Sequence, residues 1–348
     1  MRGAVKVRGW YRRRSGEAGD EASGKLIVHV GANKTGSSAI QRFLTLNAPK
    51  LLSEGIVVPG ESFEATNESK GQQVFAFQKL LEDPKKGRKR LRELLGVLDR
   101  SYPKATTTLL SAENLAAAPE APALFEGLSE RYDLKIVMYI RRQDDLILSS
   151  WQQWNSKIST DFWAWAISVI GELGDWRAHL ENWERVVPRE SIEVRVYERP
   201  KLKDGDVVAD FHGLTGTYRP LDDFVRPKRA ANPSFSEAVM DLVKGNSLIF
   251  RDAHDNDFYK LVTRMTGDHY VKSSRRSPIT FAQRQAINSR YAEKNEWVRK
   301  NYLPDTNGPL FTEPQESDYD QVLQEQLDRE KLEFLTTMMY QIYKEKGV

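Results

Sequence analysis

The chain has 348 residues, enough for a large core in one domain or in one domain with an extension. Its formal net charge of +3 is too small to indicate nucleic-acid binding, although it suits a site for a small polyanion. The absence of cysteine excludes disulfide bonds and thiolate zinc sites. Since no apolar run approaches the roughly 20 residues that span a bilayer, we expect no transmembrane segment and a cytoplasmic protein.

The first part of the chain is basic and lacks the apolar stretch of a secretory signal. We expect residues 1–24 to form a flexible basic leader. After it, short apolar or β-branched runs alternate with helical patterns, which is typical of βαβ units around a parallel sheet. The expected strands are residues 26–30, 55–59, 106–111, 134–140 and 191–197.

The character of these runs predicts where the strands lie in the sheet. The third and fourth are nearly continuous apolar runs, as expected for strands buried on both faces, whereas the fifth alternates and should lie nearer an edge. Beyond about residue 230 only helical patterns remain. The expected helices there are residues 236–244, 280–301 and 321–346, and earlier ones are 72–81 and 86–98. In the last helix, six residues have the spacing of a core-facing stripe: Leu323, Leu327, Leu335, Met338, Met339 and Ile342.

The loop after the first strand is the most informative motif. Residues 31–38 read GANKTGSS and run from a strand into an amphipathic helix, which is how proteins cradle a phosphate. In the nucleoside-triphosphate loop, G-x-x-x-x-G-K-[ST], the lysine follows the second glycine. Here Lys34 precedes Gly36 by two residues, which places its ammonium against a shorter anion lying across the loop. The alternative is an ordinary turn whose glycines serve only the backbone.

Residues 34–38, KTGSS, resemble the 5′-phosphosulfate loop K-[TS]-G-[TS]-[TS] of sulfotransferases that use 3′-phosphoadenosine 5′-phosphosulfate (PAPS), and all five positions match. Gly36 can adopt a backbone geometry closed to other residues. The helix dipole favours an anion here by about 0.3–1 kcal/mol. The resemblance implies that the nucleotide is bound by Asn33, Lys34, Thr35, Gly36, Ser37, Ser38 and Ala39.

A second anion element follows the fourth strand. Arg141 and Ser149 resemble the 3′-phosphate element R-x-P-x-x-x-x-x-S of the same enzymes, with Gln143 in the place where proline is common. Arg141 at the carboxyl end of a parallel strand can hold a phosphate by a bidentate fork, and Ser149 can add a hydroxyl. Arg142 is the rival arginine, but its spacing to Ser149 is wrong by one. The missing proline predicts a less rigid turn.

Two weaker likenesses extend the resemblance over residues 25–235. Trp183 and the fifth strand, followed by Glu198, resemble a W-(about ten)-[VI]-x-x-Y-E stretch, and residues 229–234 resemble a late R-x-x-N-x-S segment. The resemblance implies an α/β fold with a P-loop-type parallel sheet flanked by helices. The mainly helical residues 236–348 are expected to pack on the same domain as an extension.

The acceptor needs a general base, and two places offer one. Glu113 follows the third strand, where cytosolic members of the family carry a histidine, and a glutamate base would resemble the carbohydrate- and tyrosine-directed members. Those members usually take it from the region after the first helix, which here contains Glu61, Glu64 and Glu68. We expect Lys34 to be the other catalytic residue, stabilising charge on the leaving oxygen.

The resemblance implies an enzyme that moves a sulfuryl group from PAPS to an acceptor hydroxyl by in-line transfer, without a metal. Among bacterial members the acceptor is a saccharide or glycolipid, and aromatic side chains that could stack on a sugar follow Arg141; the same spacing also fits core residues. They are Trp151, Trp154, Trp163, Trp165 and Trp176. The alternatives are a P-loop kinase or NTPase, and a nucleotide-binding module without catalysis.

Overall fold

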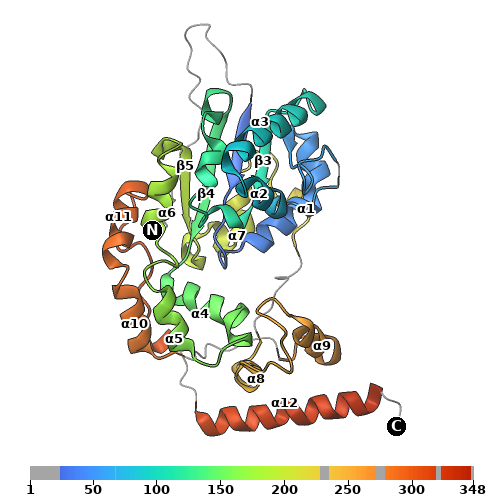
Figure 1. Cartoon of the computed structure of the whole chain (residues 1–348), viewed down its shortest axis with the longest axis vertical. Coiled ribbons are helices and arrows are strands. Elements are labelled where there is room, and N and C mark those ends of the chain that lie inside the picture. Colours follow the sequence, from blue (N-terminus) through green and yellow to red (C-terminus); the bar gives the residue numbers. More distant parts are fainter. Residues whose placement is uncertain (1–23, 67, 228–234, 271–278, 319–322, 346–348) are drawn as a thin grey trace.

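Five parallel strands form one sheet in the order β2-β3-β1-β4-β5 (Figure 1). The structure, a computed structural model, describes residues 24–66, 68–227, 235–270, 279–318 and 323–345. The predicted α/β fold with a parallel sheet is confirmed, and so is the edge position of the fifth strand. The strands are β1 Lys25–His29, β2 Ile56–Val57, β3 Thr107–Ser111, β4 Asp133–Ile140 and β5 Ile192–Val196.

Helices cover both faces of this sheet, because successive strand residues point to opposite sides. In β1, Leu26 and Val28 belong to the core shared with α3 and α6, whereas Ile27 belongs to the core shared with α1 and α7. All three side chains are buried. The helices of this part are α1 Ser37–Ser53, α2 Val74–Leu81, α3 Pro84–Ser101, α4 Gln143–Gln153, α5 Phe162–Val169, α6 Trp176–Trp183 and α7 Val207–His212.

Local sequence signals set the bounds of α3, the most basic of these helices. Asp83 is its N-cap and accepts a hydrogen bond from the Lys86 amide, and Pro84 occupies the first turn, where a proline ring fits without loss of a hydrogen bond. Leu91, Leu95 and Leu98 recur at helical spacing, and all three are buried against the sheet. The charged side of the helix therefore faces solvent.

The strand order creates a switch point between β1 and β4. After β1 the chain turns through α1 toward β2 and β3, and after β4 it turns through α4 toward β5 on the other side. The loops leaving the carboxyl ends of these two neighbours diverge, and in open α/β sheets the crevice at such a point is where ligands bind. Lys34 follows β1 and Arg141 follows β4, so the two predicted anion elements both belong to this crevice.

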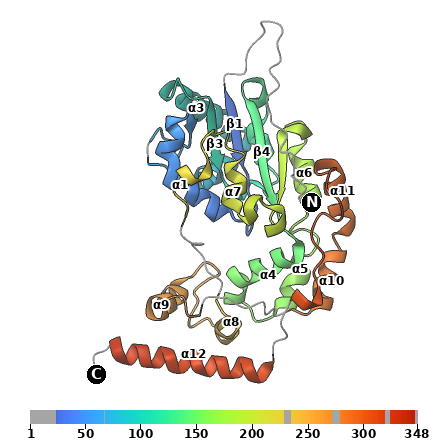
Figure 2. The same cartoon turned by 180° about the vertical axis from the view of Figure 1, so that it is seen from behind.

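The C-terminal part is helical, as predicted, and divides into two groups. α10 and α11 lie along the side of the sheet domain, and α12 crosses beside α8 and α9 at the bottom of the view (Figures 1 and 2). The single helix expected over residues 280–301 is two helices, separated at Arg290 and Tyr291. The bounds are α8 Glu237–Val243, α9 Asp257–Thr266, α10 Phe281–Ser289, α11 Ala292–Tyr302 and α12 Gln324–Glu345.

The apolar stripe of α12 is only partly core. Leu327 and Met338 are buried, as predicted, and Met338 belongs to a core cluster with residues of α8 and α9. Leu335, Met339 and Ile342 are 41%, 69% and 42% exposed, and Leu323 before the helix is also exposed, so their assignment to the core was wrong. The stripe spans more of the helix surface than its two neighbours cover, and spacing alone does not reveal that limit.

Buried charges hold the start of α4 against α10. Arg284 Nη1 lies 2.5 Å from Asp144 Oδ2 and 2.9 Å from Asp145 Oδ1. Arg142 also pairs with both aspartates. Asp144 is fully buried, and these guanidinium groups lower the pKa of its carboxyl although burial alone would raise it. The ion pairs therefore fix the helix that follows β4.

Two predictions from the sequence concern residues that lie outside the described ranges. The basic leader at residues 1–24 lies outside the described residues except for Gly24, and residues 229–234 lie wholly outside them. Within the described ranges, no helix combines the length and the apolar character needed to cross a membrane.

Substituting Arg284 tests the anchoring of α4. We expect Arg284→Ala to lower the free energy of unfolding by about 3 kcal/mol, because the buried Asp144 loses one of its partners. Arg90→Ala, which breaks an exposed pair with Glu93 on α3, should cost less than about 1 kcal/mol. Urea unfolding measures both, and equal losses would show that Arg142 alone neutralises Asp144.

Candidate active site

The loop between β1 and α1 contains three residues with left-handed backbone geometry. Gly31, Lys34 and Gly36 have φ angles of 58°, 68° and 88°. Such an angle is uncommon for a lysine, and backbone strain of this kind concentrates at functional sites. Gly36 is also the N-cap of α1 and has no side-chain cap, so the first amides of α1 face the loop.

Hydroxyl groups inside the loop maintain its shape. Thr35 Oγ1 donates to the Ala32 carbonyl at 2.6 Å, and Ser37 Oγ donates to the same oxygen at 3.2 Å. Both side chains are buried, whereas Asn33 and Ser38 are exposed to solvent. Among the residues predicted to bind the nucleotide, Thr35 and Ser37 thus hold the loop together, and Ser38 presents a hydroxyl at the surface.

Lys34 and Arg141, 107 residues apart in the chain, are in direct contact. Arg141 Nη1 donates to the Lys34 carbonyl at 2.9 Å. The Lys34 ammonium donates to Gln153 Oε1 at the end of α4, at 2.5 Å. Burial lowers the pKa of Lys34 to about 8; the Arg141 guanidinium lowers it too, and Glu113 acts in the opposite direction. The two cations outnumber the single carboxylate of Glu113 beside them, and an excess of positive charge favours binding of a polyanion.

An aromatic ring and an indole fix the position of Arg141. Its guanidinium lies 5.8 Å from the centre of the Tyr197 ring, and its carbonyl accepts a hydrogen bond from Trp176 Nε1 at 2.9 Å. Tyr197 also lies against the loop, because a Cβ added at Gly36 would be 2.8 Å from its Cε2 atom. Tyr197, directly after β5, therefore contacts both predicted anion elements.

Ser149 lies on α4 and is half-buried. It precedes Gln153 by four residues, so the two side chains share one side of the helix. Since Gln153 reaches Lys34, this side of α4 faces the loop.

Glu113 lies beside the loop at the carboxyl end of β3. A Cβ added at Gly31 would be 3.1 Å from both Cα and Cβ of Glu113, so the two segments touch. Burial raises the pKa of the Glu113 carboxyl, while a hydrogen bond with Ser37 and the charge of Lys34 act in the opposite direction. The structure therefore brings Glu113, Ser37 and Lys34 together.

The three alternative carboxylates belong to the segment that follows β2. Glu61 pairs with Lys70 at 2.8 Å, and Glu64 accepts a hydrogen bond from the Ser62 amide at 2.7 Å. Glu68 is exposed. Because β2 is the edge strand and β3 separates it from β1, these residues start from a position farther from Lys34 than Glu113 does.

The turn at Gln143 is held by hydrogen bonds instead of a proline ring. Gln143 Nε2 donates to Asn295 Oδ1 at 2.8 Å and Asn295 Nδ2 donates back to Gln143 Oε1 at 3.0 Å. Gln143 Nε2 also donates to the Gly174 carbonyl, at 3.1 Å. This reciprocal amide pair ties the start of α4 to α11, so hydrogen bonds support the turn at the position where the family usually has a proline. Arg142 is turned toward Asp144 and the Thr312 carbonyl.

The tryptophan cluster is mainly packing. Trp151 and Trp176 are buried, and the Trp151 ring lies 5.5 Å from Trp165 and 5.6 Å from Phe162. The half-buried members are Trp154, Trp163 and Trp165.

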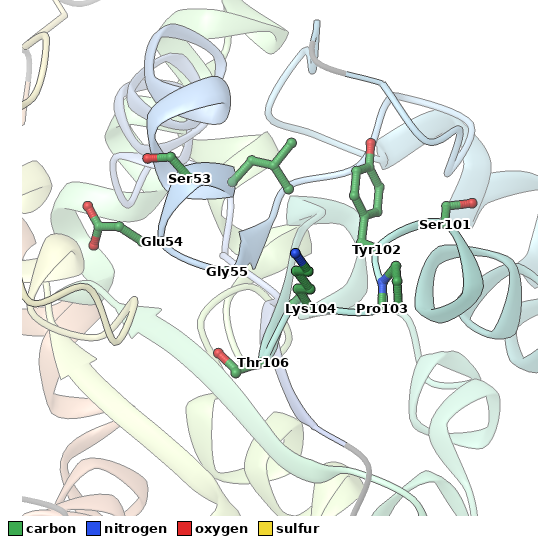
Figure 3. Close-up of a pocket in the computed structure, with 10 residues that line it drawn as sticks. Ser53, Glu54, Gly55, Ser101, Tyr102, Pro103, Lys104 and Thr106 are labelled. Atoms are coloured by element: carbon green, nitrogen blue, oxygen red, sulfur yellow. The ribbon is translucent and has the colours of Figure 1, made fainter.

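A separate pocket lies at the amino ends of β2 and β3, opposite the carboxyl ends that carry the candidate site. It has a volume of about 660 Å³ and is lined by residues 52–55 before β2 and 101–106 before β3 (Figure 3). Tyr102, Lys104 and Thr106 are among its lining side chains. Because these are the amino ends of the strands, the pocket contains no residue of the candidate site. Elsewhere in the described ranges, no three histidine or carboxylate side chains gather as a metal site would require.

Sequence reasoning missed Gln153 as the partner of Lys34 and Tyr197 as the ring beside Arg141. The i,i+4 relation of Gln153 to Ser149 was a usable signal, because it places both on one side of a helix. For Tyr197, the signal was its position at the end of a strand that follows β4.

Removing Arg141 should change the titration of Lys34. We expect Arg141→Met to raise the pKa of Lys34 from about 8 toward the ordinary value of about 10.4, because a neighbouring positive charge disappears. Arg177→Met, on the surface of α6, should leave it unchanged. NMR of ¹³C-methylated lysines, assigned with Lys34→Met, gives the titration. An unchanged Lys34 in Arg141→Met would contradict the electrostatic contact.

Comparisons with known proteins give distant similarities. No family model matches the chain. An uncharacterized protein of Archaeoglobus fulgidus is 27% identical over 214 residues, a match that spans 60% of this chain and 56% of that protein. The crystal structure of a sulfotransferase from Alicyclobacillus acidocaldarius is similar with a TM-score of 0.37 and 16% identity, over 60% of this chain and 87% of that chain. The chemistry proposed for this chain therefore rests on its own residues.

Proposed function

We propose that the protein is a PAPS-dependent sulfotransferase. The observation that supports this most directly is the contact of Arg141 with Lys34, beside Glu113, at the switch point of the sheet. The two elements that we propose to bind anions therefore lie beside a carboxyl group whose pKa is raised by burial. A nucleotide with phosphate groups at both its 3′ and 5′ positions matches this pair of elements.

The two elements would hold opposite ends of the nucleotide. Residues 33–39 would enclose the 5′-phosphosulfate with loop amides, the exposed Ser38 hydroxyl and the Lys34 ammonium. Arg141 and Ser149 would hold the 3′-phosphate, with Tyr197 keeping the guanidinium in place. Gln153 would release Lys34 to the incoming anion, since a charged partner makes a stronger hydrogen bond than an amide oxygen.

In the transfer step, the acceptor oxygen forms a bond to sulfur as the bond from sulfur to the bridging oxygen breaks. The leaving 3′,5′-bisphosphate takes that electron pair, and Lys34 stabilises the charge that develops there. Glu113 receives the acceptor proton. Burial raises the pKa of this carboxyl, which makes it a better base than an ordinary glutamate while Lys34 keeps it ionised.

The acceptor we propose is a hydroxyl group of a saccharide or glycolipid. Phe75, at the start of α2, is 61% exposed and follows Val74, whose carbonyl accepts a hydrogen bond from Asn114 at 3.1 Å. Asn114 is the residue after Glu113. An exposed aromatic ring on the segment next to the base suits stacking on a sugar ring, and its apolar area would otherwise be unfavourable in water.

Nucleotide binding separates the sulfotransferase from a kinase or NTPase. We expect 3′-phosphoadenosine 5′-phosphate to stabilise the protein by about 2.7 kcal/mol at 100 times its Kd. At the same concentration, 5′-AMP should stabilise the protein less, because it lacks the 3′-phosphate that Arg141 would bind. Arg141→Ala should remove the difference between the two ligands, whereas Arg177→Ala should preserve it. Thermal unfolding measures these shifts, and stabilisation by ATP-magnesium but not by the 3′-phosphate compound would overturn the proposal.

Transfer of labelled sulfate from PAPS to a glycan panel separates an enzyme from a binding module. We expect Glu113→Gln to lower kcat by about 100-fold or more, because it removes the base but preserves the shape of the side chain. Glu64→Gln, in the alternative segment, should have kcat close to that of the wild type. Lys34→Ala should reduce kcat more than nucleotide affinity. Wild-type turnover in Glu113→Gln would exclude Glu113 as the base.

A further inference from the structure

Three buried polar residues lie under the candidate site and have no part in the chemistry proposed above. Ser111, His29 and Gln73 are 1%, 0% and 0% exposed, and we call these three the Ser111 clamp. His29 is the last residue of β1 and Ser111 the last residue of β3, and the two are register partners in these parallel strands. Gln73 directly precedes α2.

Ser111 is held from two sides. Its Oγ shares a hydrogen bond of 2.8 Å with His29 Nδ1. Its amide donates to Gln73 Oε1 at 2.9 Å, and its carbonyl accepts from the Gln73 amide at 2.9 Å. Gln73 Nε2 in turn donates to the Pro59 carbonyl at 3.0 Å. Loss of one member would leave buried polar groups of the others without a partner, which is costly.

The clamp connects directly to the two segments of the site. Glu113 is two residues beyond Ser111, and Gly31 is two residues beyond His29. The His29 carbonyl accepts a hydrogen bond from the Ala112 amide at 2.9 Å. Since Gly31 is in contact with the main chain of Glu113, the two loops are closely packed and one cannot shift without affecting the other. Loss of the bond between Ser111 and His29 would therefore shift Glu113 relative to the loop of Lys34.

Burying the polar imidazole of His29 at this position costs free energy. Its ring packs between Tyr139 and Phe211, at centroid distances of 5.9 Å and 5.4 Å, and the Tyr139 hydroxyl donates to Asp210. Burial lowers the pKa of His29 to about 3, so the imidazole is neutral. Its Nε2 atom has no hydrogen-bond partner within the described part of the chain. An apolar ring would avoid that cost, and the bond to Ser111 is what the imidazole adds.

We infer that the Ser111 clamp sets the position of the Glu113 carboxyl, and that His29 is a positioning residue for the transfer step. The inference rests on the proposed function for its catalytic meaning, but the position of Glu113 can be tested without it. Glu113 faces Lys34 in the loop and Ser37 at the start of α1. With the clamp intact, the Glu113 carboxyl stays partly buried beside them. When the clamp is broken, the carboxyl becomes more exposed to solvent.

The experiment compares variants that break and keep the bond to Ser111. Ser111→Ala and His29→Phe break it, and His29→Asn supplies an amide near the place of Nδ1. His212→Phe is the matched control, since His212 is also buried, beside Phe43 and Phe224, on α7. The readouts are the Glu113 titration by NMR of ¹³C-carboxyl-labelled glutamate, assigned with Glu113→Gln, and kcat together with nucleotide affinity.

We expect Ser111→Ala and His29→Phe to lower the pKa of Glu113 toward about 4.3, its ordinary value. We expect kcat to fall about tenfold or more, with nucleotide affinity unchanged, because only the base is displaced. His29→Asn and the His212→Phe control should titrate like the wild type. If His29→Phe does not fold, Ser111→Ala, which loses a single oxygen atom, gives the answer.

A wild-type titration of Glu113 in Ser111→Ala would overturn the role of the clamp, whatever the enzyme's activity. Failure of the wild-type protein to transfer sulfate would instead count against the proposed function. In that case the carboxyl titration still decides whether the clamp positions Glu113.

Discussion

The hydrogen bond from Arg141 to the Lys34 carbonyl is the constraint on which the site depends. It joins the loop after β1 to the end of β4, the two strands at the switch point, and so holds these two segments together. It also requires Lys34 to keep its left-handed backbone, because the carbonyl must turn toward Arg141 while the ammonium points to Gln153. A lysine would not hold that conformation without such partners.

The electrostatics of the crevice follow from the same contact. Burial lowers the pKa of Lys34, and repulsion from the neighbouring Arg141 guanidinium lowers it further. Glu113 reduces that repulsion, and in return Lys34 keeps the glutamate more acidic than burial alone would make it. A polyanion entering the crevice would relieve the remaining repulsion, so the empty and loaded protein should differ most in the charge of Lys34 and Glu113. These two groups also have opposite tasks in the proposed reaction.

The strands and the anion loop could be predicted from the sequence because both are local patterns. A short apolar run identifies β1 or β4, and the position of Lys34 relative to Gly36 is visible in eight letters. The partners that fix those residues come from far along the chain. Asn295 pairs with Gln143 across 152 positions of the chain, and no local sequence pattern predicts that pairing. The error in α12 has the same origin, since periodicity shows that a helix has an apolar stripe but not how much of it a neighbour covers.

Two of the C-terminal helices, α10 and α11, support the site through α4. α10 holds Asp144 with Arg284, and α11 holds Gln143 with Asn295, so the first turn of α4 is fixed from two helices. That turn directly follows Arg141, whose guanidinium must reach back to the loop of β1. Without these supports the residues after β4 could turn in several directions, and the Arg141 guanidinium would no longer be oriented toward the loop. α10 and α11 therefore stabilise the orientation of Arg141 from outside the sheet, so the candidate site depends on residues as far along the chain as Asn295.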